Sequence, residues 1–166
     1  MKNLTLHVQC RGWVSLCLRI LCVLRLASCC LPTAAQNLNA TGNLSFGTFV
    51  ATSAGTVAVA PDGSRAQTGG AFVLDQGGLA AAAQFSVHGK ANATYAITLP
   101  ADNTVAMSDG KGHSMTVKAF TSNLSGLNIL SKNGNGQFNI GATLNVAASQ
   151  ARGSYTGTFA VIVNYQ

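Results

Sequence analysis

The chain ends in the sequence Gly153-Ser-Tyr-Thr-Gly-Thr-Phe-Ala-Val-Ile-Val-Asn-Tyr-Gln166, which has the clearest strand pattern in the sequence. Its large apolar side chains recur at even spacing, at Tyr155, Phe159, Val161, Val163 and Tyr165. A period of two places such side chains on one face of a β-strand. We therefore predict a strand over residues 153–165 that buries one face.

Further alternating runs lie upstream of this stretch, from Asn43 onward. Gly, Asn, Asp and Ser separate them about every eight to twelve residues, which is the spacing of a β-sandwich or barrel. No run has a sustained helical period. The sequence thus predicts an all-β, antiparallel domain whose other strands cover residues 44–51, 56–60, 70–74, 82–87, 94–99, 114–120 and 138–146.

Turn residues punctuate these predicted strands. Pro61-Asp62-Gly63 combines a fixed and a permissive φ, and Asp109-Gly110 and Asn133-Gly134 are hairpin-type pairs. Pro100 should close a strand because it cannot donate to a ladder. Gly141-Ala142 interrupts the alternation of residues 138–146, which predicts a bulge or bend there.

The first 35 residues have the features of a secretory signal peptide. Lys2 and Arg11 precede a short apolar run, and small residues follow it up to Ala35. We predict cleavage between Ala35 and Gln36, so that residues 1–35 are the signal and 36–166 the β-sandwich domain. The protein would then reach the periplasm, the cell surface or the medium. Leu26-Ala-Ser-Cys29 also resembles a lipoprotein cleavage box, and lipidation of Cys29 would be the protein's only route to a membrane.

Removal of the signal changes the charge and the cysteine content. The whole chain has ten basic and four acidic residues, a net charge of +6, but four of the basic residues and all five cysteines lie in residues 1–35. The remaining net charge is +2, from basic residues that are scattered along the chain. We therefore expect no nucleic-acid partner and no disulfide.

The sequence offers no catalytic, cofactor-binding or metal site. His88 and His113 adjoin glycines at predicted strand ends and belong to no nucleophile motif. The acidic residues of the domain all fall in predicted turns, where side-chain bonds to the backbone favour them. They are Asp62, Asp75, Asp102 and Asp109.

An ordered set of landmarks carries a family resemblance over residues 43–165. It includes Leu44-Ser-Phe-Gly47, Tyr95-Ala-Ile-Thr-Leu-Pro100, Ile140-Gly-Ala-Thr-Leu144 and the terminal alternation. The set resembles the bacterial family called domain of unknown function 4402, which is similar to fimbrial subunits and spore-coat-U-type proteins secreted by the chaperone–usher route. The resemblance implies an immunoglobulin-like, adhesin-like sandwich that takes part in assembly or adhesion without enzymatic activity.

The resemblance also implies partners and the residues that contact them. Phe159, Val161, Val163 and Tyr165 match the terminal strand by which a fimbrial subunit is held by its periplasmic chaperone and later pairs with a neighbouring subunit. An exposed strand edge of this kind is a template for strand addition. The usual disulfide of such subunits is absent after residue 30.

A candidate donor segment follows the predicted cut, where Leu38, Ala40 and Gly42 alternate weakly over a short length. Two other functions stay open at this point, a self-contained binding module, secreted or anchored at Cys29, and a hydrolase. The terminal alternation would equally suit the last core strand of a complete sandwich, because alternation alone does not distinguish the two.

Overall fold

The computed structural model describes residues 36–74 and 79–166. The predicted signal, with Ala35 and Cys29, and the predicted turn residue Asp75 lie outside the described residues. The described elements are the strands β1 (Asn37–Gly42), β2 (Thr48–Val59), β3 (Arg65–Leu74), β4 (Ala83–His88), β5 (Thr94–Thr98), β6 (Val105–Ser108), β7 (Ser114–Ser122), β8 (Asn128–Ile129), β9 (Asn135–Val146) and β10 (Ile162–Tyr165).

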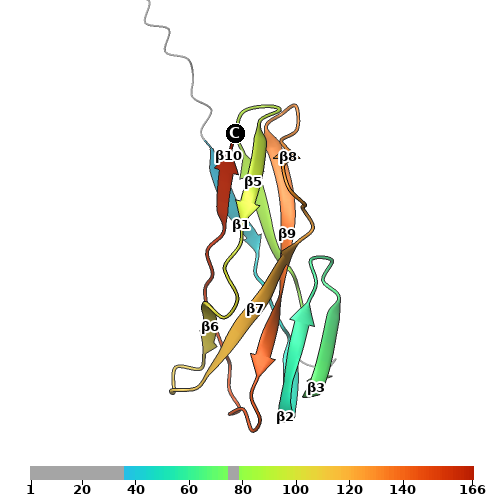
Figure 1. The fold of residues 1–166 in the computed structure, drawn as a ribbon, viewed down its shortest axis with the longest axis vertical. Coiled ribbons are helices and arrows are strands. Elements are labelled where there is room, and N and C mark those ends of the chain that lie inside the picture. Colours follow the sequence, from blue (N-terminus) through green and yellow to red (C-terminus); the bar gives the residue numbers. More distant parts are fainter. Residues whose placement is uncertain (1–35, 75–78) are drawn as a thin grey trace, which may run out of the picture. The chain divides into compact units, whose positions relative to one another are not determined.

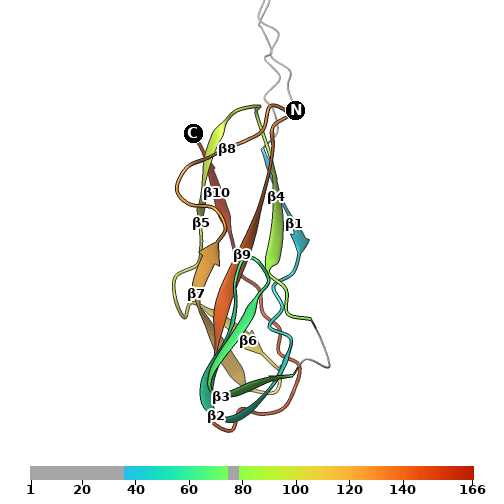
Figure 2. The ribbon, with the colours of Figure 1, turned by 90° about the vertical axis from the view of Figure 1, so that its right-hand side faces the viewer.

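The strands form two antiparallel sheets (Figure 1). The seven-stranded sheet has the order β1-β4-β9-β2-β3, with β7 paired to β9 and β6 paired to β7. The three-stranded sheet has the order β10-β5-β8. Figure 2 shows the domain from the side, with β5 and β10 on one side and β1 and β4 on the other. The prediction of an all-β domain is confirmed, and the two sheets are consistent with a β-sandwich.

Strand β9 is the centre of the larger sheet. Its first half, through Ile140, pairs with β4, its second half pairs with β2, and residues 140–144 also pair with β7. The inward side chains of Phe138, Ile140 and Leu144 are fully buried. Side chains as deeply buried as these lose nearly all contact with water, and each such burial contributes about 1.5–3 kcal/mol.

The irregularity predicted at Gly141-Ala142 lies in the neighbouring strand instead. Strand β9 runs through both residues, and the register shifts in β7 between Lys118 and Thr121. Gly141 is needed for a close approach, since a Cβ there would lie 2.2 Å from the Val59 carbonyl oxygen. Ala119, inside the β7 irregularity, has a positive φ of 49°.

Two apolar clusters form the core. The first includes Val57, Val117 and Leu144, which come from β2, β7 and β9. The second includes Val87, Tyr95, Leu130, Phe138 and Ile140, and the partly buried residues packed against it include side chains of β1, β5 and β10. The N-terminal and C-terminal strands therefore both cover the second cluster.

Several predicted strand limits were wrong. Residues 48–51 and 56–59 of the strands predicted at 44–51 and 56–60 belong to one strand, β2, whose register shifts between Ala51 and Gly55 because residues 52–54 lie opposite Gly70 alone. The short strands β6 and β8 were not predicted, and β1 was predicted only as a weakly alternating segment. Strands β6 and β8 have only four and two residues, and two of the three alternating positions of β1 are the small residues Ala40 and Gly42, so their alternation is weak.

The predicted strand at 153–165 is a strand only at Ile162–Tyr165. The cause is the partner strand. Ile162 pairs with Thr98, so continuing the same register would place Ala160 opposite Pro100, which has no N–H to donate. Before this point only Thr156 bridges to another strand, through Ser108.

Candidate functional site

Strand β10 is an end strand of the smaller sheet. It pairs with β5 from Ile162↔Thr98 to Tyr165↔Tyr95, and the Gln166 N–H donates to the Thr94 carbonyl at 2.9 Å. Because hydrogen-bonded and non-hydrogen-bonded pairs alternate in an antiparallel ladder, Asn164 bonds toward β5 while the backbone groups of Val163 and Tyr165 point the other way. No strand of the described residues pairs with this outer edge of β10.

The terminal aromatic ring makes its contacts within its own domain. The Tyr165 hydroxyl donates to the His88 carbonyl oxygen at 3.1 Å, and its ring centroid lies 6.4 Å from that of Tyr95. A Cβ on Gly89 would lie 3.0 Å from the Tyr165 ring, so the absence of a side chain at Gly89 allows the ring to pack against the backbone there. Burial raises the pKa of Tyr165 above its ordinary value of 10.

The other predicted partner-strand residues also face inward. Phe159, Val161 and Val163 are partly buried against the second cluster, whereas Ile162 between them is 56 % exposed. The Phe159 ring lies 5.2 Å from the Phe120 ring between centroids. The predicted face of the terminal segment is therefore the core-facing one.

The predicted donor segment is strand β1. It pairs with β4 from Asn37↔His88 to Gly42↔Gln84. Leu38 packs against the second cluster, and β1 has β4 as its one strand partner among the described residues. Strand β1 is therefore an edge strand of the larger sheet.

A cleft lies between the two predicted partner segments, which are β1 and the terminal segment, and we call it the seam cleft. Ala40 and Gly42 of β1 lie on one side of it, and Gly157–Phe159 of the terminal segment contribute another part of its lining. Its volume is about 240 Å³. Its lining contains no charged side chain and consists of Ala40, Gly42, Asn43, Leu44, Phe46, Ala83, Phe85, Val105, Met107, Val117, Phe120, Gly157, Thr158 and Phe159.

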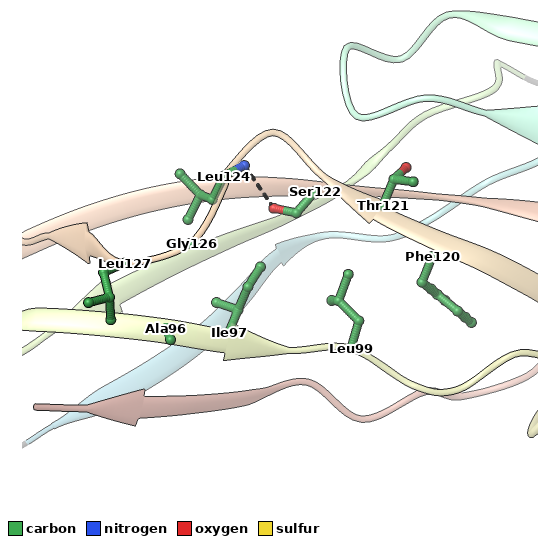
Figure 3. Close-up of a pocket in the computed structure, with 9 residues that line it drawn as sticks. All are labelled: Ala96, Ile97, Leu99, Phe120, Thr121, Ser122, Leu124, Gly126 and Leu127. Carbon is green, nitrogen blue, oxygen red and sulfur yellow. Dashed lines mark hydrogen bonds between the residues drawn. The ribbon is translucent and has the colours of Figure 1, made fainter.

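A second hollow, the lateral groove, lies between β5 and β7 (Figure 3). Ile97 and Leu99 extend toward it from β5 and the residue after that strand, and Leu124 and Phe120 flank it on the side of β7. The groove is wider, with a volume of about 520 Å³, and more open to solvent. Phe120 lines both hollows.

The histidines and acids stabilise turns and strand ends. His88 ends β4, and its Nδ1 lies 2.8 Å from Asn135 Oδ1. His113 Nδ1 lies 2.6 Å from Asp109 Oδ2 in the β6–β7 turn. Partial burial would raise the pKa of Asp109, but the hydrogen bonds from His113 and the Lys111 N–H outweigh it and lower the pKa to about 2.

The remaining described acids also bond to backbone N–H groups. Asp62 accepts from Ser64, and Asp102 accepts from Ala119 in the β7 irregularity. In residues 36–74 and 79–166 no three His, Cys, Asp or Glu side chains are grouped to hold a metal ion. Within the same ranges no helix has the length and apolarity to cross a bilayer.

Sequence reasoning missed most of the seam cleft. Phe46, Phe85 and Phe120 come from three separate segments, and only Phe159 belongs to a segment that was predicted to bind a partner. From the sequence alone, each phenylalanine is predicted to be an ordinary inward-facing residue of its own segment. Their convergence follows from the sheet order, which local alternation does not contain.

Comparison with known proteins gives one match. The family model described as "Domain of unknown function (DUF4402)" matches residues 37–165. This range begins at the first residue of β1 and ends at the last residue of β10. No curated protein and no solved structure matches the chain.

Proposed function

This chain belongs to the DUF4402 family, and on that premise we propose that it is an exported, fimbrial-like structural or adhesive subunit of a bacterial surface. It binds its partners by β-strand addition and catalyses no reaction. Its partners are a periplasmic chaperone, an usher and neighbouring subunits.

The order of the strands carries this proposal. An immunoglobulin constant-type sandwich has the strand orders A-B-E-D and C-F-G. Here β1-β4-β9-β7 follow the order A-B-E-D, and β5-β10 follow C-F, with the β2–β3 hairpin inserted between A and B. The position of the seventh strand, G, is the outer edge of β10, to which no described strand is paired.

The seam cleft supports the same proposal because Gly157–Phe159, on the segment that leads into β10, contribute to its lining. A strand laid along the outer edge of β10 would meet the outward backbone groups of Val163 and Tyr165. Where such a strand extends past Ile162 to residues 157–159, its alternate side chains would enter a cleft lined by four phenylalanines and by small residues at Ala40, Gly42 and Gly157. Strand addition gains affinity from the main chain and specificity from such pockets.

Amide hydrogen exchange tests this proposal at single residues. The probe is a synthetic peptide of about ten residues, the length of a long strand, in which apolar residues alternate with Ser or Thr. We expect it to slow exchange at the Val163 amide, which faces the open edge, and to leave Asn164, already bonded to β5, unchanged. A peptide of the same composition in scrambled order is the control. Equal exchange at Val163 with both peptides would refute strand addition at this edge.

Export is the second part of the proposal, and it rests on the composition of residues 1–35. Intact-mass measurement of the protein from its native host should give a chain that begins at Gln36. An acylated first residue at Cys29 would instead establish membrane anchoring, and an intact Met1 would refute export.

A self-contained binding module is the second candidate. The contacts that favour it are internal: Tyr165 bonds to His88, and β1 pairs along its length with β4. In that case the domain needs no added strand, and the Val163 amide would exchange alike with and without the peptide. The exchange experiment therefore separates the two candidates.

A further inference from the structure

Strand β3 ends the larger sheet on the side of β2, and no strand of the described residues pairs with its other edge (Figure 1). Exposed apolar side chains lie beside this edge. Val50 of β2 pairs with Phe72 of β3, and these two side chains and that of Leu74 are 44 %, 50 % and 41 % exposed. A long edge strand beside apolar surface is a template on which another chain can pair. Two identical antiparallel edges are self-complementary, so the chain that fits this edge is a second copy of itself.

A backbone group that such pairing needs is already bonded within the chain. The N–H of Val73 donates to Oε1 of Gln67, which belongs to the same strand. Since this hydrogen bonds to Gln67, the N–H points away from Phe49, the residue opposite Val73 on β2. Main-chain groups of successive residues point alternately toward and away from the partner strand. The main-chain groups of Val73 therefore lie on the unpaired edge of β3.

A bend in β3 brings Gln67 to Val73. In a straight strand these residues would be separated by about 20 Å. Gly69, between them, has a positive φ of 65°, which glycine adopts without steric cost. A Cβ on Gly70 would lie 2.5 Å from the backbone nitrogen of Ser53, so the two strands of the hairpin approach at this point more closely than a side chain would allow.

Two further observations show that this part of the edge is closed. Arg65 Nη2 donates to the Leu74 carbonyl oxygen at 3.3 Å, so the first and last residues of β3 are bonded to each other across the bend. Ala71, which by alternation shares the unpaired edge with Val73, is 1 % exposed. A second strand therefore finds neither residue accessible.

We propose that Gln67 is an edge-blocking residue, whose side chain occupies the Val73 N–H and prevents β3 from pairing with β3 of a second copy. A glutamine suits this role because its amide oxygen accepts the hydrogen bond that a carbonyl of a neighbouring strand would accept. The contact is autoinhibitory, since it keeps the apolar surface at Phe72 from becoming an interface. It lies on a different sheet edge from that of β10, so the inference goes beyond the proposed function and does not depend on it.

The test compares Gln67→Ala with the unchanged protein, both purified from cells that express the full-length gene. Gln67 is exposed, so the variant should fold. In dilute solution the Val73 amide should exchange roughly tenfold faster in the variant. On concentration the variant should form a dimer in sedimentation velocity, with the Val73 amide protected again, whereas the unchanged protein should show the same Val73 exchange at every concentration.

Two further variants serve as controls. Gln67→Glu keeps an acceptor oxygen and should retain slow exchange at Val73. Gln137→Ala removes another exposed glutamine, on β9, which does not pair with β3, and should change neither measurement. The Val73 amide reports on β3 and the Val163 amide on β10, so a failure of strand addition at β10 leaves this test intact.

Three results would overturn the inference. Unchanged exchange at Val73 in Gln67→Ala would show that Gln67 does not hold this amide. Faster exchange in a variant that stays monomeric on concentration would reduce the bond to a local contact without a blocking role. Dimers of the unchanged protein that protect Val73 further would show that the edge of β3 is open.

Discussion

Strand β9 and the terminal segment face the same core, but they are covered to very different degrees. The inward residues Phe138, Ile140 and Leu144 of β9 are at most 1 % exposed, and residues 140–144 of β9 have strands on both sides. The inward residues of the terminal segment are only partly buried, and β10 has a strand on one side. Ile140 and Leu144 thus have strand partners on both sides, whereas the residues of β10 have a strand partner on one side only.

Under the proposed function, this difference makes the edge of β10 the place where a partner strand is added. A segment flanked on both sides has no free backbone groups, whereas β10 presents those of Val163 and Tyr165. Partial burial beside a free edge also leaves apolar surface that an added strand would remove from water, at about 25 cal/mol per Å². The following predictions test whether the two segments differ in this way.

The largest effect is expected in β9. Phe138→Ala removes a ring that is 1 % exposed and stacks on Phe85 at 5.2 Å between centroids. We expect the free energy of unfolding to fall by about 3–5 kcal/mol, measured by urea denaturation. Phe72→Ala is the control, because Phe72 is 50 % exposed on β3, and it should change stability by roughly 0.5 kcal/mol or less. Similar losses for both variants would contradict the assignment of β9 as the core strand.

A smaller effect is expected at the end of β10. Tyr165→Ala removes a partly buried ring and its bond to His88, and should lower the free energy of unfolding by roughly 1–3 kcal/mol. Tyr165→Phe removes only the hydroxyl and should cost about 0.5–1.5 kcal/mol. If Tyr165→Ala instead left the monomer fully stable and abolished peptide binding, the ring would act on the partner and not on the domain.

Strand β9 and the terminal segment show how much of the fold and of the candidate site could be predicted from the sequence. Alternation correctly assigned an all-β domain and the inward faces of both segments, because it depends only on local spacing. It did not predict that pairing stops before Ile162, since that depends on Pro100 standing opposite Ala160 in the register. Nor could it predict the seam cleft, whose phenylalanines converge only once the strand order is known.

A charge at the mouth of the cleft should affect binding but not folding. Thr158 lines the seam cleft and is exposed, so Thr158→Lys should change stability by roughly 0.5 kcal/mol or less. The lysine would lose hydration when the peptide covers it, and we expect the alternating peptide to bind about tenfold more weakly, or 1.4 kcal/mol. Calorimetric titration measures this. Ser154→Lys, exposed on the same segment but outside the lining, is the matched control and should bind the peptide normally.

The smallest effect concerns the turn that holds the start of the terminal segment. Ser108, which bridges to Thr156, immediately precedes Asp109, whose pKa is lowered to about 2 by its bonds to His113 and the Lys111 N–H. A carboxyl with a lowered pKa in the folded state adds stability above its unfolded value of 3.8, and this stability is lost as the pH falls through about 2.

An NMR titration should place the Asp109 midpoint near pH 2, and His113→Ala should raise it. Between pH 4 and 2 the amide signals of Ser108 and Thr156 should shift, while those of β9 stay constant, because β9 is held by strands on both sides. Equal shifts in β9 would show that acid acts on the whole sheet and not on this turn.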